Sequence, residues 1–355
     1  MGVLTPAGDG AELGPGYHSP QVDVAVRLNT NESPYPPPPA FVAALAEAVA
    51  ATSFHRYPDR RATALRAALA ELHQVRADQV FCANGSNEVL QTLLLAYGGP
   101  GRTAAVFEPT YALHSHIARL TRTAVAEGER GEDFLLDLDE VRRVVAEAEP
   151  AVTFVCSPNN PTGGAEPAGT VAAVASLAPG LVVVDEAYGQ FAPWSALSMV
   201  DDGGRVVVVR TYSKTWGMAA SRLGYAVAPA PVVAELERRA LPYHLDAVKQ
   251  AAGRLALGFR AEMEARVAAV SAERARLVAG LAELAVHAWP SDANFVLFRP
   301  RDTEGHKVWQ GLVDRSVLVR DLSGWPRLEG CLRVTVGTPE EDDAFLAALA
   351  EVLDR

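Results

Sequence analysis

Five short runs of β-branched and apolar residues alternate with helical segments, and this alternation is the feature that most constrains the fold. The runs are Gln79–Cys82, Thr103–Phe107, Val152–Cys156, Leu181–Val184 and Arg205–Arg210. Amphipathic helices are predicted between them at Glu88–Ala96, Leu138–Ala148 and Thr170–Leu177. Apolar strands that alternate with helices are typical of a mostly parallel sheet covered on both faces. The sequence therefore predicts an α/β fold.

The sequence on either side of this central block predicts an arm and a smaller domain. Residues 1–33 show little hydrophobic periodicity and lead into the proline run Pro36–Pro39. Beyond the block come a long helical tract, three further strands and a closing helix, at Ala247–Leu284, Asn294–Phe298, Val317–Arg320, Leu332–Val336 and Glu341–Leu353. We expect residues 1–33 to be an N-terminal arm. Residues 34–50 and 247–355 should form a small α+β domain, and residues 51–246 a large one.

The composition excludes several classes of function. The chain of 355 residues has 43 acidic and 32 basic residues, a balance that disfavours nucleic-acid binding. It has no apolar run of the ~20 residues that a membrane span needs, and its opening stretch lacks the basic and apolar parts of a signal peptide. Cys82, Cys156 and Cys331 stand far apart, without the spacing of a metal site or a disulfide framework. We expect a cytoplasmic protein with buried, reduced thiols and no metal.

Polar residues follow each predicted strand of the central block. In open parallel sheets ligands bind at the carboxyl ends of the strands, where the loops converge. The segments that reach this edge are Ala83–Glu88, Glu108–Tyr111, Ser157–Gly163, Asp185–Tyr188 and Thr211–Lys214. They bring a helix N-terminus, an aromatic ring, a tight turn, an acid and a lysine to one place.

This set of side chains is what pyridoxal phosphate requires of a protein. A lysine amine binds its aldehyde covalently, and a carboxylate beside its ring nitrogen keeps that nitrogen protonated. Lys214, one of only three lysines in the chain, and Asp185 are the candidates. The remaining contacts are expected from Gly85, Ser86, Asn87, Ser213 and Arg222 to the phosphate, from Asn159 and Tyr188 to the ring hydroxyl, and from Tyr111 to the ring face.

Several motifs in order along the chain resemble the fold-type-I pyridoxal-phosphate aminotransferases. They are Ser157–Gly163, Asp185–Tyr188, Thr211–Lys214 and Ser221–Tyr225. Within that superfamily the chain is most similar to the histidinol-phosphate aminotransferases, through Leu28–Glu32, Arg56–Pro58, Pro242–Tyr243, Asn294–Phe295, Leu318–Asp321 and Gly330–Thr338. The resemblance spans the middle of the chain and both ends.

The resemblance implies roles for further residues. Such enzymes are homodimers with shared active sites, and Tyr57 would reach the phosphate of the neighbour's cofactor. Arg333 would bind the carboxylate of the amino donor, while Arg320 and Tyr17 would hold the second anionic group, with Asn31 also at the substrate. Lys214, with Asp185 and Tyr188, would carry the transfer of an amino group from histidinol phosphate to 2-oxoglutarate, a step of histidine biosynthesis.

Two other enzymes remain open on the same residues. An aromatic amino-acid aminotransferase accepts phenylalanine or tyrosine in such a crevice, and a decarboxylase for threonine phosphate shares the lysine and the acid. A regulator without catalytic activity would need a basic DNA-binding domain, and the arm of 33 residues is too poor in basic residues to supply one. His55, His114 and His116 lack a partner pattern and are expected at the surface or in packing.

Overall fold

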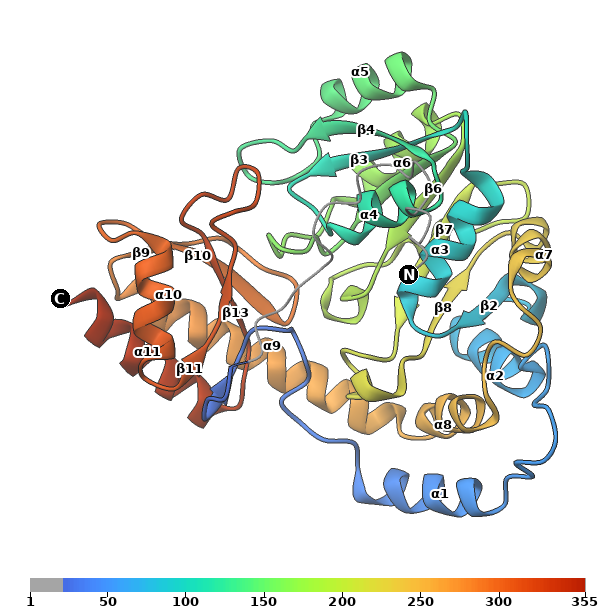
Figure 1. The fold of residues 1–355 in the computed structure, drawn as a ribbon, viewed down its shortest axis with the longest axis horizontal. Coiled ribbons are helices and arrows are strands. Elements are labelled where there is room, and N and C mark those ends of the chain that lie inside the picture. The colour runs from blue at the N-terminus through green and yellow to red at the C-terminus, as the bar shows by residue number, and fades with distance from the viewer. Residues whose placement is uncertain (1–21, 355) are drawn as a thin grey trace, which may run out of the picture.

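The computed structural model, which describes residues 22–354, is built around a seven-stranded sheet (Figure 1). Its order is β2-β8-β7-β6-β5-β3-β4, and only β8 runs antiparallel to its neighbours. The strands are β2 (Val80–Ala83), β3 (Thr103–Glu108), β4 (Ala124–Glu129), β5 (Val152–Cys156), β6 (Leu181–Asp185), β7 (Val206–Thr211) and β8 (Gly224–Val227). The predicted α/β fold with a mostly parallel sheet is confirmed.

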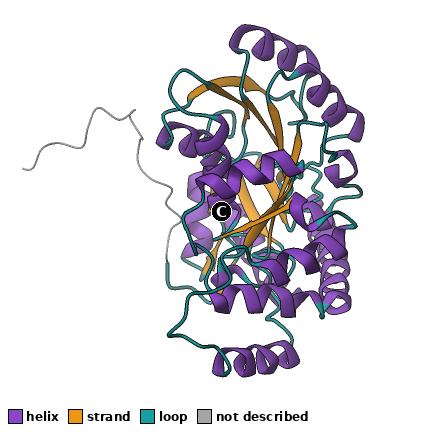
Figure 2. Cartoon of the chain, turned by 90° about the vertical axis from the view of Figure 1, so that its right-hand side faces the viewer, coloured by secondary structure: helices purple, strands orange, loops and turns teal. Residues whose placement is uncertain are grey.

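Helices cover both faces of this sheet, as Figure 2 shows from the side. One face packs against α3 (Ser86–Tyr97), α4 (Leu113–Leu120) and α7 (Ala230–Arg239). The other packs against α5 (Leu138–Ala148) and α6 (Ala168–Leu177). Successive residues of a strand point to opposite faces, so Val183 joins the first apolar cluster while Val182 and Val184 join the second. Strands β5, β6 and β7 are consequently buried along their whole length.

A third apolar cluster joins helices from distant parts of the chain. Phe41 of α1 (Pro39–Ala50) packs in it with Leu65 of α2 (Thr63–His73) and Ala252 of α8 (Ala247–Leu257). The predicted tract at 247–284 is two helices, because the chain turns at Gly258 before α9 (Arg260–Ala282) begins. The domain boundaries given above stay a prediction.

The C-terminal elements form a separate layer, drawn in orange and red in Figure 1. Their antiparallel sheet has the order β12-β13-β10-β9. The elements are β9 (Val286–Ala288), β10 (Phe295–Pro300), α10 (Gly305–Val313), β11 (Val317–Leu318), β12 (Arg320–Asp321), β13 (Leu332–Thr335) and α11 (Pro339–Leu353). The N-terminal strand β1 (Val26–Arg27) pairs in parallel with β11, so this part of the predicted arm belongs to this layer.

Two acids meet inside this layer. Asp342, in the first turn of α11, has no exposed surface, and its Oδ1 accepts a hydrogen bond of 3.0 Å from the Gly337 N–H. Burial, together with the nearby carboxyl of Glu273 on α9, raises the pKa of Asp342 to about 8. Arg276 on α9 faces the pair and lies 2.6 Å from Glu273. The folded chain therefore holds a proton on Asp342 at neutral pH.

This proton makes the stability depend on pH. The unfolded chain releases it near the ordinary pKa of 3.8, so the free energy of unfolding should fall as the pH rises from 3.8 to about 8. The slope from this group is at most ~1.4 kcal/mol per pH unit. In Asp342→Asn the amide replaces the protonated acid, and urea unfolding between pH 5 and pH 8 should show a flatter slope than the wild type. Glu340→Gln, which changes an exposed acid in the same turn of α11, should keep the wild-type slope. An equal slope in Asp342→Asn would contradict the assignment.

Candidate active site

A cavity of about 120 Å³ lies at the carboxyl ends of β5, β6 and β7, between the large sheet and the C-terminal layer. Its walls come from strand ends, from the start of α3, from the segment before α1 and from β13. The lining residues are Thr30, Asn31, Ser86, Asn87, Tyr111, Cys156, Asn160, Asp185, Ala187, Tyr188, Thr211, Ser213, Lys214, Arg222 and Arg333. Ten of the residues singled out in the sequence thus meet in one cavity.

Lys214 follows β7 directly and projects its amine into this cavity. Nζ donates a hydrogen bond of 3.0 Å to the carbonyl oxygen of Thr30 and lies 5.7 Å from the centre of the Tyr188 ring. Burial, then the positive charge of Arg333, lowers the pKa of Lys214 to about 7, with Glu32 acting in the opposite direction. Much of the amine is therefore neutral at neutral pH, which is the nucleophilic form.

Asp185 ends β6 and is held in place from two sides. Its Oδ2 lies 3.0 Å from Nε2 of His114, and its Oδ1 accepts a hydrogen bond from the Ala187 N–H. His114, on α4, has no exposed surface, and its ring stacks on Phe154 with the ring centres 4.6 Å apart. The sequence analysis expected only a surface or packing role for His114, because its partner is 71 residues away along the chain.

The start of α3 offers a cradle for an anion. Gly85 precedes the helix with a φ of +84°, and no side chain caps the first turn, so the N–H groups of Ser86 and Asn87 are not used by a cap. A Cβ at Gly85 would lie 3.0 Å from Nη2 of Arg222, so glycine allows the guanidinium to approach. Arg222 Nη1 also lies 3.4 Å from the Ser213 hydroxyl. This donor set suits a phosphate group.

The opposite wall comes from β13 and the segment before α1. Arg333 is buried and donates hydrogen bonds to Oδ1 of Asn160 and, at 3.0 Å, to the carbonyl oxygen of Asn29. Arg320 is buried beside it, since the two arginines are register partners on β12 and β13. This wall carries a high density of positive charge.

The Tyr188 hydroxyl is tied to the same wall. It accepts a hydrogen bond of 2.9 Å from Nδ2 of Asn31, whose backbone N–H donates to Thr335 Oγ1. Burial raises the pKa of Tyr188 well above its ordinary value. The hydroxyl therefore keeps its proton and can donate it to a bound ligand.

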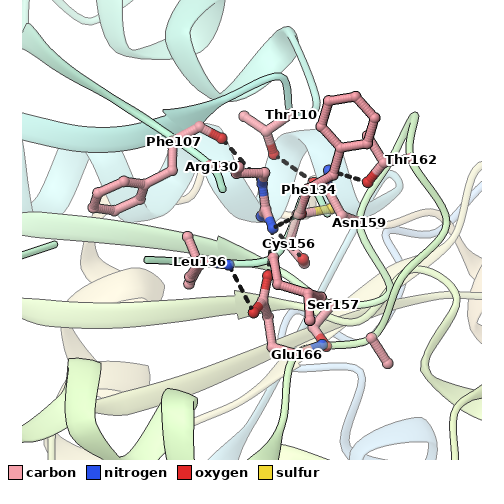
Figure 3. Close-up of polar contacts among 12 residues, drawn as sticks. Phe107, Thr110, Arg130, Phe134, Leu136, Cys156, Ser157, Asn159, Thr162 and Glu166 are labelled. Carbon is pink, nitrogen blue, oxygen red and sulfur yellow. Dashed lines mark hydrogen bonds and ion pairs between the residues drawn. The ribbon is translucent and has the colours of Figure 1, made fainter. Parts of the chain in front are cut away.

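The structure places Asn160, rather than Asn159, in the lining of the cavity. Asn159 is fully buried behind it, where its Nδ2 donates to the carbonyl oxygen of Pro109 at 2.9 Å and to Thr162 Oγ1 at 2.8 Å. Its Oδ1 accepts from the Thr110 hydroxyl at 2.9 Å (Figure 3). From the sequence we expected Asn159, the first of two adjacent asparagines, at the ring hydroxyl of the cofactor. Only the path of the loop in the structure shows which of the two side chains lines the cavity.

Of the predicted residues that the structure describes, Tyr57 does not line this cavity. Tyr57 is 81% exposed and stacks on Tyr243, with the ring centres 4.5 Å apart. Tyr17 lies outside the described residues.

Other classes of site find no support in residues 22–354. The three cysteines are free and buried, as expected. No group of histidine, cysteine, aspartate or glutamate in this range could hold a metal ion. None of the helices described is long and apolar enough to cross a membrane.

The chain matches a family model and many curated proteins. The model for aminotransferase class I and II matches residues 23–349. A histidinol-phosphate aminotransferase of Thermobifida fusca is 49% identical over 346 residues, 96% of this chain and 93% of that protein. One of Frankia casuarinae is 48% identical over 353 residues, 95% of this chain and 87% of that protein.

Solved structures share the fold over almost the whole chain. A putative histidinol-phosphate aminotransferase from Erwinia carotovora atroseptica superposes with a TM-score of 0.86 at 26% identity, covering 95% of this chain and 98% of that one. The histidinol-phosphate aminotransferase of Sinorhizobium meliloti, solved in complex with pyridoxal-5'-phosphate, has the same fold, with a TM-score of 0.86 at 24% identity and 93% and 91% coverage.

Proposed function

The chain belongs to the class I and II aminotransferases, and we propose that it uses pyridoxal phosphate to transfer the amino group of histidinol phosphate to 2-oxoglutarate. The observation that carries the proposal is the cavity in which the Lys214 amine, with a pKa of about 7, faces a carboxylate and an anion cradle. Relatives that are 43–49% identical and carry the name histidinol-phosphate aminotransferase support the substrate. The cytoplasm is the compartment we propose for this biosynthetic reaction.

The residues of the cavity fit the cofactor group by group. Lys214 would bind it covalently, and Asp185, oriented by His114, would pair with its ring nitrogen. Ser213, Arg222 and the start of α3 would hold the phosphate. Asn160 and Tyr188 would donate to the ring hydroxyl, and Tyr111 would lie against the ring. When bound, the cofactor supplies an electron sink for the negative charge that forms on the substrate carbon.

Lys214 is the residue placed to move the proton. Burial and the positive charge of Arg333 depress the pKa of its free amine, so this amine is close to neutral at physiological pH. A neutral amine can accept the proton from the substrate carbon, and as an ammonium group it would return that proton to the aldehyde carbon of the cofactor. The carbonyl oxygen of Thr30, 3.0 Å away, accepts a hydrogen bond from the amine and so helps to hold it.

The arginines of the C-terminal layer would bind the anionic ends of the substrates. The guanidinium of Arg333 can form the two parallel hydrogen bonds that a carboxylate accepts. Arg320 and, in the arm, Tyr17 would hold the second anion, which is the phosphate of histidinol phosphate or the distal carboxylate of glutamate. Both substrates thus present an anion to the same positive wall.

A single half-reaction tests the substrate. Histidinol phosphate, mixed with the cofactor-loaded protein without a 2-oxo acid, should rapidly convert the cofactor to its aminated form, followed by absorbance. Phenylalanine should convert it far more slowly. Preferential conversion by phenylalanine would make the protein an aromatic aminotransferase. Release of carbon dioxide from added threonine phosphate, without amination of the cofactor, would make it a decarboxylase.

Variants in the same assay test the assignment of the lysine. Lys214→Ala should lower kcat by ~10³-fold or more, because it removes both the nucleophile and the proton carrier. Lys307→Ala, which removes an exposed lysine of α10, should leave kcat unchanged. Turnover retained in Lys214→Ala would contradict the proposal.

An exposed apolar patch supports the proposal of a homodimer. Phe54, Tyr57, Leu241 and Tyr243 are 71%, 81%, 76% and 41% exposed. Tyr57 and Tyr243 stack on each other, and Phe54 and Leu241 lie within three residues of them along the chain. Exposed apolar side chains that lie together are typical of an interaction surface. A second copy of the chain would cover the patch, and Tyr57 would then reach the phosphate of the cofactor in the partner.

Sedimentation and cofactor titration test the dimer. The wild type at micromolar concentration should sediment with twice the mass of the chain. Tyr57→Phe should lower the affinity for the cofactor by ~5-fold or more, the effect of one lost hydrogen bond to a charged group. Tyr97→Phe, on α3, should not change this affinity. A monomeric wild type, or full affinity in Tyr57→Phe, would contradict the shared site.

A further inference from the structure

Behind the candidate active site, Arg130 and Glu166 form an ion pair that solvent does not reach (Figure 3). Their side chains are 1% and 0% exposed. Arg130 follows β4, and Glu166 precedes α6, so the pair joins two connections of the large sheet. Neither residue lines the cavity.

The Arg130 guanidinium also donates hydrogen bonds to backbone carbonyl groups at the ends of two neighbouring strands. Nε donates to the carbonyl oxygen of Phe107 in β3 at 3.2 Å, and Nη2 to that of Cys156 in β5 at 3.5 Å. Nη1 donates to Phe134 at 3.0 Å as well as to Glu166. The planar fork thus sets the spacing between the carboxyl ends of β3 and β5.

Glu166 uses both of its carboxylate oxygens and its backbone. Oε1 accepts from Arg130, and Oε2 accepts from the Leu136 N–H at 3.1 Å. Its own N–H donates to the Ser157 hydroxyl at 3.0 Å. The loop 157–166 is therefore closed on itself at the point where the ion pair forms.

The two strand ends that Arg130 joins carry residues of the cavity. The segment after β3 holds Thr110 and Tyr111, and the loop after β5 holds Asn159 and Asn160. Asn159 connects these segments through its bonds to Pro109 and Thr110. A shift of one strand end against the other would break those bonds and move Asn160 in the wall of the cavity.

We propose that Arg130 and Glu166 are positioning residues, which fix the loop after β5 so that Asn160 lines the cofactor cavity. The inference rests on the proposed function, since it concerns how the protein holds pyridoxal phosphate. A buried ion pair adds little net stability, because the loss of hydration offsets the attraction between the charges. This pair instead fixes the geometry of the surrounding loops. It does so through four hydrogen bonds to backbone groups and through the Glu166 carboxylate, which accepts one hydrogen bond from Arg130 and one from the Leu136 N–H.

The substitution Glu166→Gln tests this geometry while keeping the size of the side chain. The two donors approach different carboxylate oxygens, so in the amide either Arg130 or the Leu136 N–H would face an NH2 group instead of an acceptor. If Asn160 then moves, the ring oxygen of the cofactor loses a hydrogen-bond donor, and the negative charge on that oxygen is less stabilised. The lysine-bound cofactor should hold its proton more tightly. The pH midpoint of its absorbance change should therefore shift upward by ~0.5 units or more.

Two control variants separate positioning from a loss of stability. Leu349→Ala removes a fully buried side chain of α11, so it should lower the melting temperature without shifting the pH midpoint. Glu147→Gln breaks an exposed ion pair with Arg143 on α5, and it should change neither the melting temperature nor the pH midpoint. If Glu166→Gln does not yield folded protein, the pH midpoint of Arg130→Lys tests the same proposal. A single ammonium group cannot replace the several hydrogen bonds that the planar guanidinium of Arg130 donates.

The outcomes are distinct. An upward shift in Glu166→Gln or Arg130→Lys, absent from both controls, supports the positioning role. A wild-type midpoint in the variant overturns it, even when the melting temperature falls as in Leu349→Ala. A wild type that shows no lysine-bound cofactor overturns the proposed function as well, so the two failures are distinguishable.

Discussion

The complete burial of β5, β6 and β7 is the constraint on which the rest of the structure depends. These strands are covered on both faces, so the polar residues that follow them in the sequence lie at the strand ends. Because the strands are parallel and adjacent, the three carboxyl ends deliver Asn160, Asp185 and Lys214 to one edge. The C-terminal layer closes over this edge and adds Arg333. Arg327 also joins the C-terminal layer to the large sheet. It donates hydrogen bonds of 3.3 Å to the backbone carbonyl oxygens of Glu108 and Gly131.

Charge inside the cavity is opposite to the charge of the chain as a whole. The chain carries a formal net charge of −11, yet the cavity gathers Lys214, Arg222 and Arg333 around the single carboxylate of Asp185. This arrangement has two consequences. It attracts ligands that carry phosphate or carboxylate groups. Together with burial, which is the larger cause, it lowers the pKa of Lys214 and so keeps the amine neutral and reactive near neutral pH. In the proposed function the same positive charges would serve both substrate binding and proton transfer.

The sequence predicts five of the seven strands of the large sheet and the place of Lys214 after β7, because both depend on local patterns. It does not predict β8, although this strand is buried. The strand Val152–Cys156 and the helix Leu138–Ala148 have the predicted bounds, because apolar runs and helical periodicity are visible in the sequence itself. The sequence analysis did not predict β4, whose exposed positions include Glu127 and Glu129, because an edge strand lacks the apolar run of a buried one. His114, Asn160 and the Arg130–Glu166 pair were missed for a different reason. Their roles come from contacts across 36 to 173 positions of the chain, which no local pattern records.

The proposed function requires that Lys214 bind pyridoxal phosphate covalently in this cavity. The most direct test is to reduce the cofactor-loaded protein with borohydride, which makes the bond between lysine and cofactor permanent, and to locate the modified residue by mass spectrometry of its peptides. The account predicts one phosphopyridoxyl group per chain, on Lys214. Modification of Lys249 or Lys307 instead, or of no lysine at all, would contradict it.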